Sequence, residues 1–92
     1  MKLEISELAT EDFNRLRKFI SINNPVAANR MATRLAKGIR GLLLYPEVGK
    51  EVKMATNPKI TRDVFILDYH VRYTYTKKIL LVLKVWHQKE DR

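Results

Sequence analysis

The sequence predicts an α+β fold in which a short strand and a two-helix hairpin precede a three- or four-stranded antiparallel sheet (β-α-α-β-β-β). Residues 10–44 carry apolar side chains at helical spacing, with a proline dividing them, whereas residues after Gly49 change to the alternation of strands. The last strands are joined by short connections, which favour an antiparallel meander. A chain of 92 residues has room for one hydrophobic core, so we expect a single domain over residues 1–92.

The first strand is expected at residues 2–6, where polar and apolar side chains alternate. Thr10 supplies a hydroxyl that can accept from free backbone N–H groups, and Glu11 and Asp12 favour the positive end of a helix dipole. We therefore expect the first helix to begin at Thr10 and to end before Pro25. Its apolar positions at helical spacing are Phe13, Leu16, Phe19 and Ile20.

The second helix shows the clearest periodicity in the chain. Asn24 is the expected N-cap and Pro25 the first helical residue, where a missing N–H costs nothing. The pattern runs to about Leu44, before Pro46 and Gly49. One stripe contains Ala28, Met31, Leu35, Ile39 and Leu42, and the opposite face contains Arg30, Arg34 and Lys37. We expect this long helix to pack on one face of the sheet.

The remaining elements are read from alternation and turn residues. We expect strands at residues 52–54, 64–67, 71–76 and 79–86, a loop at residues 56–59 and a turn at residues 77–78. The segment 64–67 is apolar on both faces, which indicates a strand near the centre of the sheet. In the next strand, Tyr69, Val71 and Tyr73 share one face.

Composition excludes several classes of function. There is no cysteine and there are only two histidines, so we expect neither a disulfide nor a metal site. The longest uninterrupted apolar run, Ile79–Leu83, is far short of the roughly 20 residues of a membrane span. The first residues lack the apolar segment of a signal peptide. We therefore expect a cytoplasmic protein without membrane contact.

Positive charge is concentrated in the helical hairpin. The formal net charge is +8, and no acid occurs from Phe13 through Pro46. A basic helix face can simply be solvated surface, but a stretch this long without acids also suits a polyanion or an acidic protein partner. The candidate residues for such a partner are Arg15, Arg30, Arg34 and Lys37.

The end of the last strand is the second candidate region. Histidine titrates near neutrality and can move protons in phosphodiester chemistry, although His87 can equally be structural. Trp86 is expected to cover the open end of the core. If the sheet face opposite Tyr69 is open, four residues could converge there on a nucleic acid backbone: Lys53, His70, Arg72 and His87.

Five segments together resemble the RelE/ParE superfamily of bacterial type II toxins, with greater similarity to the ParE branch. They are residues 9–13, 24–28, 44–50, 65–73 and 82–91. The resemblance covers nearly the whole chain. It implies a small antiparallel sheet with a helical hairpin, a cognate antitoxin as partner, and no metal or organic cofactor. RelE-like members cleave messenger RNA on the ribosome with lysines, arginines and a tyrosine or histidine near the carboxyl end, whereas ParE-like members block DNA gyrase.

Two departures from the nuclease pattern favour the gyrase branch. His70 follows Tyr69 where RelE-like toxins usually have an arginine, and no tyrosine follows Asp91. The expected function is therefore a gyrase inhibitor that blocks replication and is neutralised by an acidic antitoxin. One alternative is a ribosome-dependent mRNA endoribonuclease that uses Lys53, His70, Arg72 and His87. The other is a binding module without toxicity. If the target is gyrase, the residues expected to bind it are Trp86, His87, Gln88, Lys89 and Arg92.

Overall fold

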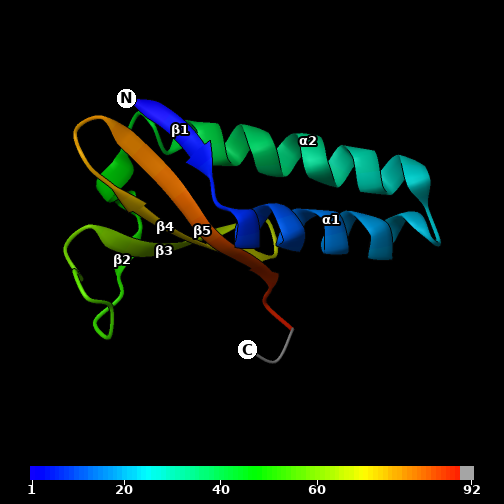
Figure 1. Ribbon diagram of the computed structural model, residues 1–92. Helices are drawn as coiled ribbons and strands as arrows, with labels where there is room; N and C mark the ends of the chain where they lie inside the picture. The colour runs from blue at the N-terminus through cyan, green and yellow to red at the C-terminus, as the bar shows by residue number, and fades with distance from the viewer. Residues whose placement is uncertain (90–92) are drawn as a thin grey trace.

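A computed structural model describes residues 1–89 and confirms the predicted order of a strand, a two-helix hairpin and then antiparallel strands, of which the described residues form four, the first only two residues long (Figure 1). The elements are β1 (Lys2–Ile5), α1 (Glu7–Ser21), α2 (Pro25–Gly41), a 3₁₀ turn η1 (Pro46–Val48), β2 (Lys50–Glu51), β3 (Thr61–Ile66), β4 (Tyr69–Tyr75) and β5 (Ile79–His87). Within the described residues the strands form one sheet in the order β1-β5-β4-β3-β2. Neighbours from β2 to β5 are antiparallel, while β1 runs parallel to β5, so the sheet is mixed.

Helix α1 begins three residues before the predicted start. Ser6 is its N-cap, because the Ser6 Oγ atom accepts a hydrogen bond from the Ala9 N–H at 3.0 Å. The Thr10 hydroxyl instead donates to the Ser6 carbonyl oxygen, and Thr10 lies within the helix. Asp12 is likewise not at the helix terminus; its buried carboxylate accepts from the Val85 N–H at 3.0 Å and so ties α1 to β5.

The two helices lie side by side on one face of the sheet, and the hairpin tip projects past it (Figure 1). All five residues of the predicted α2 stripe are buried, and Arg30, Arg34 and Lys37 are exposed, as the periodicity predicted. The helix ends at Gly41, and residues 42–44 continue as a turn rather than as helix. On α1, Leu16 is buried, whereas Phe19 is 72% exposed although it shares the helical spacing.

Gly38 permits the close approach of α2 to β3. A Cβ atom at this position would collide with the Cγ2 methyl of Ile66, so a side chain here would push the helix and the strand apart. Gly41, at the end of the same helix, has no atom within 4 Å of the equivalent position. The close packing therefore depends on one glycine and not on the other.

Tyr73 fixes the turn between α2 and β2. Its hydroxyl donates to the Pro46 carbonyl oxygen at 2.6 Å and accepts from the Gly49 N–H at 3.0 Å. Burial raises the pKa of the Tyr73 phenol above its ordinary value, and the Gly49 hydrogen bond partly offsets that effect. The β2 strand follows immediately at Lys50–Glu51, so the prediction of a strand at residues 52–54 was wrong by two residues. The Val52 N–H still donates to the Thr61 carbonyl oxygen, and the chain turns directly after this residue.

None of the helices in residues 1–89 is long and apolar enough to cross a membrane.

Candidate functional site

A β-bulge in β5 decides which way the last residues of the sheet point. Lys84 pairs with Arg72 and Val82 pairs with Tyr73, so Leu83 is an extra residue without a partner on β4. The Ser6 Oγ atom donates a hydrogen bond to the carbonyl oxygen of Leu83 at 3.0 Å. The bulge reverses the alternation, which places the buried positions at Leu80, Val82 and Val85.

Trp86 and His87 are successive strand residues and lie on opposite faces of the sheet, and the bulge decides which face each of them takes. The Trp86 ring stacks on His70 on the face away from the helices, with centroids 4.1 Å apart and planes at 24°. The sequence predicted that Trp86 covers the open end of the core. This prediction was wrong, because the ring lies on the other face of the sheet. His87 lies on the helix side, where its ring contacts Tyr69 edge-on at 5.3 Å.

The outer face of the sheet carries a cluster built across three adjacent strands, which we call the outer cluster. Its members are Asp63 and Phe65 of β3, His70 and Arg72 of β4, and Trp86 of β5. Cross-strand pairing sets the arrangement: Phe65 is opposite His70, and His70 is opposite Trp86. The guanidinium carbon of Arg72 lies 5.5 Å from the centre of the Trp86 ring. Phe65, which lies on the other side of His70 from Trp86, remains 59% exposed.

Asp63 is the anchor of the outer cluster. Arg72 donates two parallel hydrogen bonds to its carboxylate, from Nε at 2.8 Å and from Nη2 at 2.9 Å. His70 Nε2 also lies 2.9 Å from Oδ2, but the direction of its N–H does not meet hydrogen-bond geometry. Partial burial alone would raise the pKa of Asp63; the contacts with Arg72 and His70 outweigh it and hold the pKa below its ordinary value. The pKa of Arg72 is correspondingly raised by its hydrogen bonds to Asp63.

The four residues expected to converge on a nucleic acid do not form one site. His70 and Arg72 are adjacent in the outer cluster, whereas His87 is on the helix side of the sheet. Lys53 lies exposed in the turn after β2. Arg72 is also held by Asp63, which occupies donors that a phosphate would require. The sequence prediction failed here because alternation could not reveal the bulge.

The expected target-binding residues are displayed around the end of β5. Gln88 is exposed, and its N–H donates to the Asp68 carbonyl oxygen at 3.0 Å, while the Lys89 N–H donates to His87 Nδ1 at 3.1 Å. These bonds extend the turn beyond the strand. Arg92 lies outside the described residues.

A cavity of about 500 Å³ lies between α1 and the end of the sheet, and we call it the α1–β5 cavity. Its apolar wall comes from Leu16, Phe19 and Ile20 of α1 and from Tyr69 of β4. The polar residues that line it are Arg15, His87 and Lys89. Arg15 lies 3.5 Å from Asp12, and its side chain is 43% exposed.

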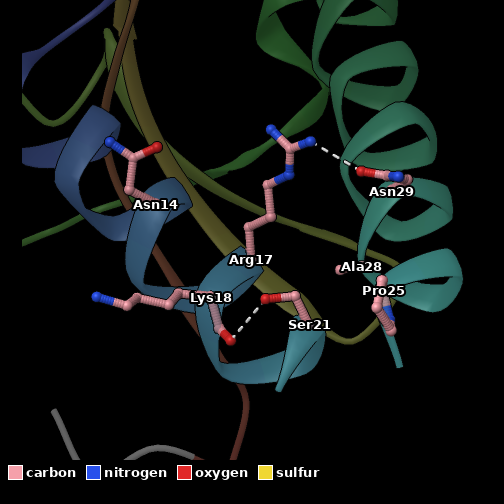
Figure 2. Close-up of a pocket in the computed structure, with 7 residues that line it drawn as sticks. All are labelled: Asn14, Arg17, Lys18, Ser21, Pro25, Ala28 and Asn29. Atoms are coloured by element: carbon pink, nitrogen blue, oxygen red, sulfur yellow. Dashed lines mark hydrogen bonds between the residues drawn. The ribbon is translucent and has the colours of Figure 1, made fainter. Parts of the chain in front are cut away.

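The basic residues of the hairpin do not form a single cluster. Arg30, Arg34 and Lys37 share the exposed face of α2, while Arg15 is on α1 beside the α1–β5 cavity. A second cavity, of about 320 Å³, lies between the helices. Figure 2 shows Arg17 reaching across it to Asn29 at 2.8 Å, while Lys18 points away. These two cations therefore do not converge on one ligand.

Sequence reasoning missed Asp63, Phe65 and Tyr69 as members of a candidate site. The strand alternation placed His70 and Arg72 on one face, but it did not supply the register that brings Asp63 opposite Arg72. A match of opposite charges between neighbouring strands was the available signal.

The model of the family "ParE toxin of type II toxin-antitoxin system, parDE" matches residues 3–92. The chain belongs to the ParE toxin family. Its fold is similar to that of a chain from a structure described as the chromosomal ParDE TA system from P. aeruginosa, with a TM-score of 0.75. The two chains are 13% identical, and the match covers 95% of each. No curated protein sequence matches the chain. The expected ParE branch of the superfamily is thus confirmed, as is the ParE-like fold.

Proposed function

We propose that this ParE-family toxin inhibits DNA gyrase in the bacterial cytoplasm, blocks replication, and is neutralised by a cognate acidic antitoxin. The observation that carries the proposal is the family match over residues 3–92, which assigns the chain to the toxin half of a parDE-type system. Gyrase as the target rests on the resemblance of the carboxyl-terminal segment to ParE toxins. The proposed contact residues are Trp86, His87, Gln88, Lys89 and Arg92, of which all but Arg92 are described.

The positions of these residues support a protein-binding role. Trp86 is partly exposed on one face of β5, His87 is partly exposed on the other, and Gln88 and Lys89 are exposed beyond it. A partner that encloses the end of the strand can contact both faces. Tryptophan is among the residue types enriched at the strongest contacts of protein interfaces.

The endoribonuclease alternative has less support. It requires cations to hold the phosphate and an acid or base within hydrogen-bond reach of the same reacting group. The candidate base His87 and the candidate cation Arg72 are on opposite faces of the sheet. Arg72 is also bound by Asp63 through two hydrogen bonds.

The test is induced expression in a bacterium, followed by separate measurement of DNA, RNA and protein synthesis. We expect DNA synthesis to fall first and cells to become filamentous. Supercoiling by purified gyrase should fall when purified toxin is added. Unchanged supercoiling, together with transcripts cut within codons on ribosomes, would instead establish the nuclease alternative.

A further inference from the structure

The outer face of the sheet displays large apolar rings that do not belong to the core. Phe65 is 59% exposed there, whereas Val64 and Ile66, its neighbours on β3, pack against the core on the other face. His70 joins Phe65 to Trp86, with ring centroids 4.7 Å and 4.1 Å away. We call Phe65, His70 and Trp86 the aromatic row. A contiguous exposed row of this kind is typical of an interaction surface.

Leu67 supplies an independent observation next to the aromatic row. It is the only residue in positions 1–89 with a positive φ, at 57°, where the Cβ atom of a leucine crowds the backbone. Glycine or asparagine would adopt this conformation more easily in the turn between β3 and β4. The sequence instead places a leucine there, with 43% of its surface exposed. A strained backbone that displays an apolar side chain to solvent points to a role in binding.

The turn between β3 and β4 is continuous with the proposed gyrase-binding segment. The Gln88 N–H donates to the Asp68 carbonyl oxygen at 3.0 Å, and the Gln88 side-chain amide donates to the Asp68 carboxylate at 3.5 Å. Trp86, two residues before Gln88, is the member of that segment that lies on the outer face. A partner that contacts Trp86 and Gln88 can therefore also reach Phe65 across the face and Leu67 in the turn.

The charges beside the aromatic row favour a partner that carries carboxylates. Pairing between neighbouring strands aligns three cations and one acid across the outer face, namely Lys50, Asp63, Arg72 and Lys84. Asp63 accepts two hydrogen bonds from Arg72, so its charge is matched within the row. The two lysines give the row a net positive charge, which attracts an acidic surface.

The arrangement of the rings favours a protein over a nucleic acid as the partner. Proteins that bind single-stranded nucleic acids stack the bases on open aromatic faces. Here the His70 and Trp86 rings are stacked on each other with their planes at 24°, and the Arg72 guanidinium lies over the Trp86 ring. These contacts occupy ring faces that a base would need. An apolar pocket of a folded partner can instead enclose the outer edges of the rings.

We propose that gyrase binds the outer face of the sheet, where Phe65 and Leu67 are apolar contacts beside Trp86. Carboxylates of gyrase lie next to Lys50 and Lys84 in this complex. This inference rests on the proposed function for the identity of the partner. It adds to the carboxyl-terminal segment two contact residues from β3 and the turn after it, and it selects the outer face as the side from which the target approaches.

The test compares variants of the full toxin in supercoiling assays with purified gyrase. Phe65→Thr keeps a residue that favours strands, and Leu67→Asn keeps one that tolerates a positive φ, so both should fold. The matched control is Leu44→Asn, which changes an apolar residue with 78% exposure in the turn after α2. We expect at least tenfold more protein to be needed for half-inhibition with each outer-face variant, and less than twofold more with the control. Thermal melts should establish that all three variants are folded.

Urea denaturation tests the role of Leu67 separately from gyrase. Leu67→Asn should unfold at the same urea concentration as the native toxin or at a higher one, because asparagine relieves the strained φ. Unfolding at a clearly lower concentration would show that the leucine side chain serves the fold, and it would contradict its assignment as a binding residue.

Photo-crosslinking and growth separate the site from the identity of the target. A benzophenone amino acid at position 65 should attach to a gyrase subunit, whereas one at position 44 should not; a crosslink from position 65 to DNA or RNA would overturn the choice of a protein partner. Equal inhibition by the native toxin and both folded outer-face variants would overturn the binding face and leave gyrase as the target. If the native toxin never inhibits gyrase, but both outer-face variants and not the control lose growth arrest on induction, the outer face stands and gyrase fails as its partner.

Discussion

Asp63 connects two side chains that reach it from the neighbouring strand, and its ionisation should therefore affect stability. Its pKa lies below the ordinary value of 3.8, because the contacts with Arg72 and His70 outweigh the effect of partial burial. A carboxyl group with a lowered pKa in the folded state stabilises the fold above its unfolded pKa. That contribution is lost as the pH falls below about 3.8 and through the folded value.

We predict that Asp63→Asn lowers the free energy of unfolding at pH 7 by roughly 1–3 kcal/mol, the scale of hydrogen bonds to charged groups. The difference from the native protein should shrink when the pH is lowered from 5 to 3, because Asp63 of the unfolded chain then takes up a proton that the folded carboxylate, with its lowered pKa, binds less readily. Urea denaturation followed by the fluorescence of Trp86, the only tryptophan, measures both quantities. Glu51→Gln, at an exposed position of β2, is the matched control. A difference that is constant across this pH range would contradict the role assigned to Asp63.

His87 separates the two proposed targets at the level of a single side chain. We predict that His87→Ala weakens gyrase inhibition by tenfold or less, because a single polar contact contributes roughly 0.5–1.5 kcal/mol and a tenfold change in affinity corresponds to about 1.4 kcal/mol. A nuclease that uses this imidazole for proton transfer should instead lose roughly 10²-fold or more in cleavage. Dose–response curves for supercoiling and for ribosomal mRNA cleavage distinguish the two outcomes. A cooperative melt must first show that loss of the Tyr69 contact has not unfolded the variant.

At the scale of elements, the packing of α2 on β3 gives a prediction with an internal control. Gly38→Ala should gain about 1 kcal/mol of helix propensity. It should nevertheless destabilise the protein by roughly 1–3 kcal/mol, because the new methyl group meets the branched carbon chain of Ile66 in a packed core. Gly41→Ala places the same methyl group in open space and should be neutral or stabilising. Chemical denaturation of the two variants gives the comparison. Equal stability of Gly38→Ala and Gly41→Ala would show that α2 does not depend on this close contact.

Elements with a strong local sequence pattern were predicted more accurately than elements with a weak one. The buried stripe of α2 was predicted in full, since helical periodicity over many residues depends on one repeated spacing. The predicted start of α1 was wrong because Ser6 and Thr10 are both good N-cap residues. The pairing of β1 with β5 ends just before Ser6, and this position selects Ser6 as the N-cap. Phe19 was expected at an apolar position and is exposed. Periodicity identifies a face, but it cannot tell that the helix extends beyond the sheet it covers (Figure 1).

The candidate site was less predictable than the fold, because it depends on relations between strands. The side chains of Tyr69, Val71 and Tyr73 are buried as alternation predicted, and His70 and Arg72 face away from them. Alternation then failed in β5, where the unpaired Leu83 reverses the direction of every later side chain. His87 was consequently grouped with residues of the opposite face. The register of β3, which brings Asp63 to Arg72, is not signalled within either strand alone, and only the match of their opposite charges across the two strands indicates it.

At the scale of the whole molecule, stability and proposed activity are located in different parts of the chain. The hydrophobic core lies between the two helices and the central strands, and it ends at Val85. The proposed gyrase-binding segment begins at Trp86, so it lies at or beyond the edge of that core. A change in this segment should therefore affect function more than folding.

We predict that a chain ending at His87 folds with nearly native stability but no longer inhibits gyrase. Deletion of residues 88–92 removes the hydrogen bonds from the Gln88 N–H to the Asp68 carbonyl oxygen and from the Lys89 N–H to His87 Nδ1. A hydrogen bond contributes roughly 0.5–1.5 kcal/mol, and bonds of exposed residues such as these two lie at the low end of that range. None of the core side chains is lost. Supercoiling assays and urea denaturation should be run in parallel on the shortened chain. The full-length double variant Gln88→Ala/Lys89→Ala keeps the chain length and tests whether these two side chains carry part of the effect. A shortened chain that unfolds cooperatively and still inhibits gyrase as strongly as the full chain would remove residues 88–92 from the target interface and leave Trp86 and His87 as the remaining candidates within the carboxyl-terminal segment.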